Sequence, residues 1–144
     1  MREIKFRGKG KDNIGEIEIG DWLYGGIVFD NDRYWIDIPY YGNIIVDNNT
    51  IGQYTGLKDK NGVEIYEGDI VKFKFCRKEI NAEIKFGEYL ESKCDEYDCT
   101  HYGYYLDYKY SNYCDNTGKD LNDINSMCEV IGNIYDNPEL IENT

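Results

Sequence analysis

The sequence predicts an all-β protein, built from small barrel-like or sandwich-like subdomains with a short helical turn near the C-terminus. Two features of the chain support this fold class. Apolar and polar residues alternate with a period of two in several short runs, as they do in strands that bury one face. The chain also holds 15 Tyr and 15 Gly but 2 Pro, and Tyr favours strands while Gly favours the tight turns between them.

The first part of the chain is expected to form short strands that are separated by turns rich in Gly, Asp and Asn. Ile4 and Phe6 alternate with basic residues in the first of these strands. The next strand carries Gly25 and Gly26, and paired glycines inside a strand mark a bulge or a close approach of another backbone segment. The predicted strands of this part cover residues 2–7, 22–29, 33–38 and 44–46.

Residues 50–71 combine two turns with two extended runs. Asn61 and Gly62 suit a tight reversal, because both residue types tolerate positive φ. A second turn is expected at Glu67-Gly68-Asp69, where the short carboxylate of Asp69 can accept hydrogen bonds from backbone N–H groups. We favour this structural role over a catalytic one. The alternative is a hydrolytic pair of carboxylates drawn from Glu64, Glu67 and Asp69.

The clearest hairpin of the chain is predicted at residues 70–75 and 80–86. Apolar residues occupy every second position of both runs, and lysines or other polar residues lie between them. Hairpins of this form open many small SH3-like barrels, which is an analogy of fold and assigns no function. Further strands are expected at residues 102–110 and 130–135, with a helical turn at 121–127 and a short terminal helix at 137–140.

Three blocks of the chain resemble the YopX protein family, whose members occur mostly in bacteriophages and prophages of low-GC bacteria. The blocks are residues 2–9, 50–71 and 130–140, and together they bracket most of the chain. No motif of the family matches residues 88–127, which are rich in Tyr, Asp and Cys. The resemblance implies a largely β fold and a phage or prophage origin, and it implies no defined activity.

The length of the chain suits a single YopX-like domain of residues 1–144, or two β subdomains of about residues 1–66 and 67–144. No apolar run approaches the roughly 20 residues that a membrane helix needs. The N-terminus also lacks the apolar segment of a signal peptide. We therefore expect the protein to lie in the cytoplasm of an infected or lysogenic bacterial host and to have no membrane partner.

Acidic residues dominate the charge of the chain and lie mainly in its C-terminal part. The formal net charge is −12, and residues 91–144 contain 12 acidic and 3 basic residues. Such a surface repels phosphate backbones, so direct nucleic-acid binding is not expected. We expect that this negative charge keeps a protein with many exposed aromatic residues soluble. The alternative is that the acidic part mimics DNA or fills a basic groove on a host protein.

The five cysteines do not suggest a disulfide framework, because their number is odd and the expected compartment is reducing. We expect reduced thiols that pack as small apolar groups or lie at the surface, and we expect no cofactor. The alternative is a tetrahedral zinc site with the spacing C-x4-C-x-H-x12-C, which matches no standard zinc module. Its ligands would be Cys94, Cys99, His101 and Cys114.

No group of residues in the sequence points to catalysis, and we expect that the protein is not an enzyme. Cys99 and His101 would share one face of a strand, but acidic neighbours disfavour the thiolate that a nucleophilic cysteine needs. A small polar and aromatic pocket for a nucleotide or a peptide is the better candidate. The alternative is a scaffold role, with the polar side chains bonded to backbone and the rings in the core. The residues concerned are Trp22, Tyr24, Gln53, Tyr54 and Thr55.

The sequence favours a non-enzymatic phage or prophage accessory protein that acts by protein–protein interaction or self-assembly. Edge strands rich in Tyr and Ile favour symmetric pairing into a homo-oligomer. Residues 91–113 offer an acidic, Tyr-rich surface for a host protein, since Tyr is enriched in interface cores. The alternative function is a counter-defence protein that sequesters a nucleotide signal, with the base stacked on the rings around Trp22 and Tyr54.

Overall fold

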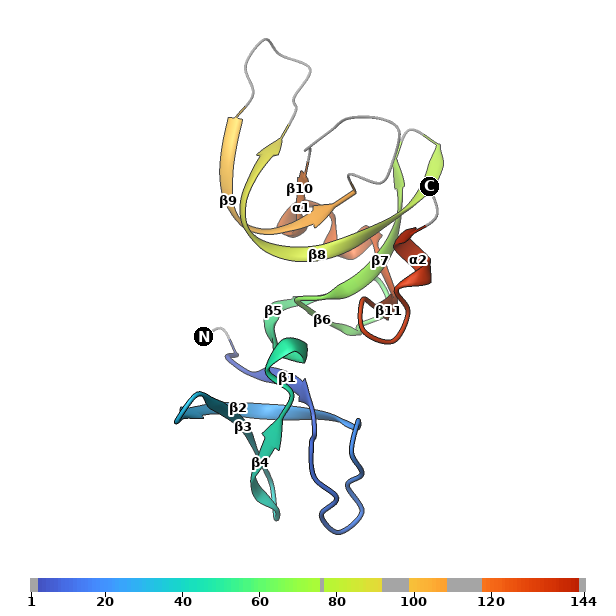
Figure 1. Cartoon of the computed structure of the whole chain (residues 1–144). Coiled ribbons are helices and arrows are strands. Elements are labelled where there is room, and N and C mark those ends of the chain that lie inside the picture. Colours follow the sequence, from blue (N-terminus) through green and yellow to red (C-terminus); the bar gives the residue numbers. More distant parts are fainter. Residues whose placement is uncertain (1–2, 76, 92–98, 109–117, 143–144) are drawn as a thin grey trace. The chain divides into compact units, whose positions relative to one another are not determined.

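The computed structural model describes residues 3–75, 77–91, 99–108 and 118–142, and it confirms the predicted all-β fold (Figure 1). Most of these residues belong to two antiparallel sheets, and the helices among them are single short turns. The chain divides into two compact units, Met1–Gly56 and Leu57–Thr144. This division lies before the boundary near residue 66 that the sequence suggested, because Leu57 and Ile65 pack into the core of the second unit.

Antiparallel strands in the order β4-β3-β2-β1-β5 form the first unit. Asn31 and Asp32 make the tight turn between β2 and β3, and both adopt the positive φ that a two-residue hairpin turn requires. The elements are β1 (Phe6–Lys9), β2 (Trp22–Asp30), β3 (Arg33–Ile38), β4 (Gly42–Val46), the 3-10 turn η1 (Asn48–Thr50) and β5 (Gly52–Lys58), which continues into the second unit.

A small barrel is closed in the first unit where the chain leaves β1. Gly10 forms an isolated antiparallel bridge with Val46 at the end of β4. Beside this bridge, the N–H of Asp47 donates a hydrogen bond of 2.8 Å to the carbonyl of Lys9. Part of the outer edge of β4 is therefore paired within the chain rather than left open. The core inside the barrel consists of Leu23, Ile36, Ile44 and Val46.

The close backbone approach predicted for the glycine pair of β2 occurs at Gly25. A Cβ atom at this position would overlap the backbone oxygen of Asp37 on β3. A Cβ atom at Gly26 would meet nothing within 4 Å. The first glycine is therefore required by the packing of two strands, whereas the second is not.

The second unit is built on the sheet β10-β9-β8-β7-β11. The predicted hairpin is confirmed as β7 and β8, with Val71 opposite Ala82. The elements of the second unit are β6 (Glu64–Tyr66), β7 (Asp69–Phe75), β8 (Lys78–Glu91), β9 (Cys99–Asp107), β10 (Gly118–Asp120), α1 (Leu121–Ile124), the 3-10 turn η2 (Asn125–Met127), β11 (Glu129–Asn133) and α2 (Glu139–Glu142). Of these, β6 pairs with β5 in the strand order. The buried core comprises Ile65, Val71, Phe73, Ala82, Ile84, Leu106, Tyr108, Leu121, Ile124 and Cys128.

Strands β8 and β9 are long and curve together (Figure 1). Along them Gly87 lies directly opposite Gly103, and their φ angles are 148° and 155°. Residues with a side chain rarely adopt such angles, so the backbone conformation favours glycine at both positions. Along β8 before the glycine pair, Ile84 lies in the core. Beyond the glycine pair, Tyr102 on the paired strand is exposed.

The carboxylate of Asp59 joins the central motif to the last strand. Its Oδ1 accepts hydrogen bonds from the N–H groups of Asn61 at 2.8 Å and Val63 at 2.9 Å. Its Oδ2 accepts a hydrogen bond of 2.9 Å from the N–H of Val130 on β11. The residue is 6% exposed, so one buried side chain satisfies three backbone donors and links two of the blocks noted in the sequence.

Both turns predicted in the central motif are present. Gly62 and Gly68 have φ angles of 81° and 88°, in the left-handed region that glycine tolerates. The predicted role of Asp69 is confirmed as well, because its buried Oδ2 accepts a hydrogen bond of 2.8 Å from the N–H of Tyr66.

The block that closes the chain is organised around Asn133. Its side-chain oxygen accepts hydrogen bonds from the N–H groups of Tyr135 at 3.0 Å and Asp136 at 2.9 Å. Its carbonyl accepts a hydrogen bond of 2.8 Å from the N–H of Asn137. A Cβ atom on Gly132 would overlap the Asn137 side chain. The Gly-Asn sequence is thus explained by the tight loop that leads from β11 to α2.

Candidate functional site

Three of the five predicted binding residues share one face of the first unit. In the register of β1 with β2, Arg7 lies opposite Tyr24 and Lys9 lies opposite Trp22, so these four side chains point to the same side. The register of β5 with β1 places Tyr54 on this side too. The structure therefore brings together the aromatic residues that the sequence singled out, and it adds basic residues to them. We call this group the cation–aromatic face.

Basic side chains of the cation–aromatic face lie against its rings. The guanidinium carbon of Arg7 is 4.7 Å from the centroid of the Trp22 ring, and Nζ of Lys9 is 5.3 Å from the same ring. Nζ of Lys5 is 5.1 Å from the centroid of the Tyr54 ring. Such cation–π contacts hold positive charge on one face of an acidic chain.

The predicted binding residues differ in exposure and orientation. Arg7 and Tyr54 are 5% and 4% exposed, whereas Tyr24 is 48% exposed. Gln53 and Thr55 belong to the opposite side of β5, because successive side chains of a strand alternate, and Thr55 is buried. The three aromatic residues and the two polar residues therefore do not line one common pocket.

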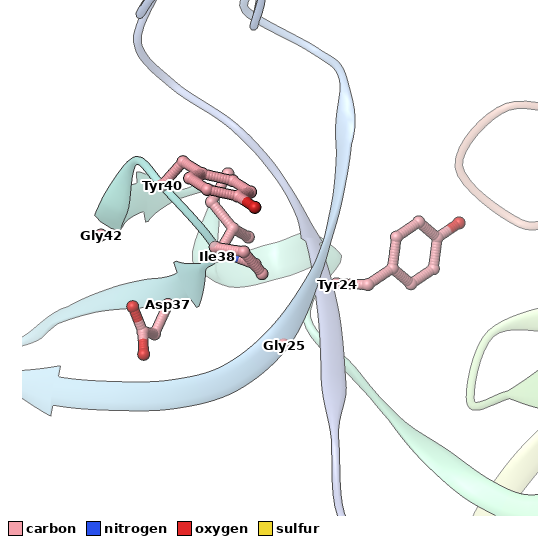
Figure 2. Close-up of a pocket in the computed structure, with 7 residues that line it drawn as sticks. Tyr24, Gly25, Asp37, Ile38, Tyr40 and Gly42 are labelled. Atoms are coloured by element: carbon pink, nitrogen blue, oxygen red, sulfur yellow. The ribbon is translucent and has the colours of Figure 1, made fainter.

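An open pocket of about 560 Å³ lies on the first unit where β2 passes the end of β3. Tyr24 is the one predicted residue among those that line it. Figure 2 shows the ring of Tyr24 directed away from Tyr40, on the other side of the β2 ribbon. The lining residues are Tyr24, Gly25, Asp37, Ile38, Pro39, Tyr40 and Gly42.

A second candidate surface consists of aromatic and apolar side chains on β8 and β9. Phe86, Leu90 and Tyr102 are 50%, 38% and 75% exposed. The Phe86 ring lies 5.3 Å from the Tyr102 ring and 4.8 Å from the Tyr104 ring, measured between centroids. We call these four residues the β8–β9 aromatic surface.

The sequence predicts strands at residues 80–86 and 102–110, but it does not predict that this surface is exposed. Phe86 continues the two-residue period of Ile84, so the pattern alone groups it with the core. The glycines at 87 and 103 are the signal in the sequence, because paired glycines mark a bend where a strand can leave the core. Of the contact segment predicted at residues 91–113, the structure describes 91 and 99–108, and the other residues lie outside the described part.

The opposite face of β8 and β9 carries stacked aromatic rings and an ion pair. The Tyr89 ring lies between His101 and Tyr105, with centroids 5.5 Å and 4.7 Å away. Nζ of Lys85 is 2.8 Å from a carboxylate oxygen of Asp107. Burial opposes the charge of Lys85, but the hydrogen bond to Asp107 and the negative charges of Glu83 and Asp107 together outweigh burial and raise the pKa of Lys85. Burial and the charge of Asp107 raise the pKa of Tyr105. This face is thus occupied by packing within the chain.

The alternative zinc site falls largely outside the described part of the chain. Cys94, Cys114 and the side chain of Cys99 are not among the described residues. The ring of His101 stacks on Tyr89. Among the side chains that the structure describes, no group of three or more His, Cys, Asp or Glu is arranged to hold a metal ion.

Comparison with known proteins identifies the family. The family model described as YopX protein matches residues 23–142, which is most of the chain. The chain belongs to the YopX protein family. It is also similar to the crystal structure of protein EF1440 from Enterococcus faecalis, with 26% sequence identity and a TM-score of 0.52 over 99% of this chain and 100% of that chain. No curated protein matches the chain.

The YopX match includes the residues that hold the turns and strands of this protein together. Asp59 and Asn133 both lie within the matched range, and both bind backbone N–H groups. The basic residues of β1 precede residue 23, but the likeness to EF1440 covers nearly the whole chain. No helix in the described part of this YopX protein is long and apolar enough to cross a membrane.

The thiol of Cys128 is expected to make the stability of this YopX protein depend on alkaline pH. Burial and the nearby charge of Asp59 raise its pKa from the ordinary 9.0 to about 11. Above pH 9 the unfolded chain loses the thiol proton first and so binds fewer protons than the folded chain. The free energy of unfolding should therefore fall as the pH rises from about 9 to about 11.

Urea unfolding at several pH values in this range measures the effect. The matched variant Cys128→Ala removes the titrating group, so the difference between wild type and variant should shrink as the pH rises. If the difference in free energy of unfolding between wild type and Cys128→Ala stayed constant through this pH range, the raised pKa of Cys128 would be contradicted.

Proposed function

We propose that this YopX-family protein is a non-enzymatic accessory protein, encoded by a phage or prophage, which acts in the bacterial cytoplasm by binding another protein. The β8–β9 aromatic surface is the observation that carries the proposal. Contiguous exposed apolar side chains mark interaction sites on soluble proteins, and Tyr and Phe are enriched in the cores of interfaces. The surface also lies on paired strands, which present its rings in a fixed arrangement.

The charge of the protein favours a basic partner over a second copy. Glu88 is exposed on β8 directly opposite Tyr102, so a carboxylate lies within the aromatic surface. The whole chain carries a formal charge of −12. Two copies that met through this surface would bring like charges together, whereas a basic host protein would be attracted to it. The proposed partner is therefore a protein with a positively charged surface and an apolar centre.

The positions of the acidic residues in the central motif support a function without catalysis. The buried carboxylates of Asp59 and Asp69 accept hydrogen bonds from backbone N–H groups. The side chain of Glu64 accepts a hydrogen bond of 3.4 Å from the Tyr66 hydroxyl. These contacts assign structural roles to carboxylates that would otherwise be candidates for acid–base chemistry.

The proposal predicts that partner capture depends on Phe86 and Tyr102. Protein from the wild type, Phe86→Ser and Tyr102→Ser should be used to capture partners from lysate of the host, followed by affinity measurement with the captured protein. Each substitution should weaken binding by about tenfold or more, because a central aromatic residue of an interface contributes on this scale. Phe29→Ser is the matched control, since Phe29 is 58% exposed on the first unit.

Two results would overturn this proposal. One is equal capture by wild type, Phe86→Ser and Tyr102→Ser. The other is a wild-type homodimer, detected by light scattering, that Phe86→Ser dissociates, because the surface would then be covered by a second copy.

A second candidate function, sequestration of a nucleotide signal, is favoured by the cation–aromatic face. Lys5, Arg7 and Lys9 place positive charge beside the rings of Trp22 and Tyr54, and phosphate and base are bound by such groups. A nucleotide present at about 100 times its Kd should stabilise the fold by about 2.7 kcal/mol. Thermal-shift measurements with cyclic and linear nucleotides test this, and a shift that persists in Lys9→Gln would exclude this face as the site.

A further inference from the structure

We propose that the open edge of β8 binds an extended segment of the partner protein, which joins the sheet as a further antiparallel strand. The segment carries a basic residue between two apolar residues, at every second position. The inference rests on the proposed function and adds to it the form of the partner and the backbone groups that hold it. We call the residues concerned, Phe86, Glu88 and Leu90, the β8 edge.

Strand β8 loses its neighbour on the β7 side after Ile84. The last register pair of β7 with β8 is Ile70 opposite Glu83. Just before β7, the N–H of Gly68 donates a hydrogen bond of 2.9 Å to the carbonyl of Ile84. Strand β8 continues to Glu91, but in the described part of the chain no strand pairs with its β7 side beyond Ile84. The last part of β8 therefore has one bare edge.

The alternation of the backbone decides which groups point to this bare edge. The carbonyl of Ile84 points toward β7, so the N–H and C=O groups of every second residue after it point the same way. The register of β8 with β9 runs to Glu91 without a shift, so no bulge interrupts the alternation. The groups of Phe86, Glu88 and Leu90 therefore face the open side. An extended chain laid along this edge would find alternating N–H donors and carbonyl acceptors, as in strand addition to other sheets.

The side chains of the β8 edge determine which segment it would accept. They lie on one face of the strand, because side chains alternate. Phe86 and Leu90 are 50% and 38% exposed, and Glu88 is exposed between them. Directly opposite residues of an antiparallel pair have their Cβ atoms about 4.5–5.5 Å apart. A segment with the order apolar, basic, apolar at every second position would thus match this edge residue by residue.

Charge favours a segment of a basic protein over the same edge of a second copy. In the two-fold register that uses the whole β8 edge, Glu88 would lie opposite Glu88 of the other copy. Like charges directly opposite each other on paired strands are destabilising, and each chain carries a formal charge of −12. Charged residues on edge strands commonly prevent such self-pairing. A basic residue opposite Glu88 removes this repulsion and replaces it with attraction.

Backbone-amide NMR and hydrogen exchange of the full chain test the inference, with acetyl-Val-Thr-Arg-Thr-Val-amide as the probe. Binding should give saturable shifts and slower exchange at the amides of Phe86, Glu88 and Leu90. An N-methyl group on the backbone nitrogen of the arginine blocks its hydrogen bond to the carbonyl of Glu88, and it should weaken binding by about fivefold or more. The matched control is an N-methyl group on the first threonine, whose N–H points away from β8, and it should leave the affinity nearly unchanged.

Two substitutions at Leu90 test the same hydrogen bonds from the side of the protein. Leu90→Pro removes an N–H from the β8 edge, and proline is tolerated where the N–H of an edge strand faces solvent. Leu90→Ala loses the apolar side chain but keeps the N–H. The probe should bind Leu90→Pro about fivefold more weakly than Leu90→Ala. The spectra also report whether each variant is folded, so a loss of binding cannot be confused with a loss of structure.

Equal binding of the two N-methylated probes would overturn the proposal, as would equal binding of the probe to Leu90→Pro and Leu90→Ala, or the absence of saturable shifts at the β8 edge. Slow exchange of the edge amides without the probe would also overturn it, because the edge would already be covered. If that protection rose with protein concentration, the cover would be a second copy. Failure of these tests together with weaker partner capture by Phe86→Ser would leave the proposed function standing, with a partner held by side chains alone.

Discussion

Replacing Asp59 by Asn is expected to lower the free energy of unfolding of the second unit by about 3 kcal/mol. The carboxylate accepts three backbone hydrogen bonds in a buried site. An amide keeps the shape but turns one acceptor into a donor. With its oxygen toward Asn61 and Val63, the new NH2 group would face the N–H of Val130, and this buried donor would lose its partner. Urea unfolding followed by circular dichroism measures the change.

The control for this prediction is Asp120→Asn in the same unit. Asp120 caps α1 by accepting a hydrogen bond of 2.9 Å from the N–H of Asn122 at an exposed position. Asn caps helices about as well as Asp, so this variant should change stability by less than about 0.5 kcal/mol. Equal losses in the two variants would show that charge removal, rather than the buried contacts of Asp59, sets the effect.

Substituting Gly25 by Ala is expected to destabilise the first unit by about 3 kcal/mol. The added methyl group would overlap the backbone oxygen of Asp37, and a backbone atom in a paired strand cannot move aside as the end of a flexible side chain can. Strands β2 and β3 would have to separate locally and weaken their hydrogen bonds. Tryptophan fluorescence during urea unfolding reports this change, because Trp22 and Trp35 both belong to the first unit.

Gly26→Ala is the neighbouring control. Its methyl group would meet nothing within 4 Å, and alanine restricts the unfolded chain more than glycine does, so stability should stay the same or rise by about 0.5 kcal/mol. Similar losses at Gly25 and Gly26 would contradict the packing argument, since they would indicate a general penalty for side chains in this part of β2.

The features of the fold that could be predicted from the sequence are local ones. Alternation located the β7–β8 hairpin, and the glycines at 62 and 68 located the two turns of the central motif. The contact of Asp59 with Val130 could not be predicted, because it joins residues 71 positions apart. A single sequence contains no local signal for such a contact.

The candidate site could likewise be predicted only in part, because its residues come together through strand pairing. The aromatic rings of Trp22 and Tyr54 mark them as binding candidates in the sequence, and the strand registers place them on one face with basic residues that the sequence does not assign to the site. Gln53 offers an amide next to the phenol of Tyr54 in the sequence, but neighbouring residues of a strand point to opposite sides. Exposure of Phe86 depends on where the hairpin leaves the core, which is a property of packing rather than of pattern.

Site-specific photocrosslinking tests the central claim, that the β8–β9 aromatic surface binds a basic partner protein. A photoreactive benzoyl-phenylalanine would replace Phe86 in one variant and Phe29 in another, because both residues are aromatic and about half exposed, at 50% and 58%. The variants would be produced in the bacterial host and irradiated there. We predict one discrete crosslinked product with a different protein from position 86 and none from position 29. Equal labelling from both positions, or a product that contains two copies of this chain, would contradict the claim.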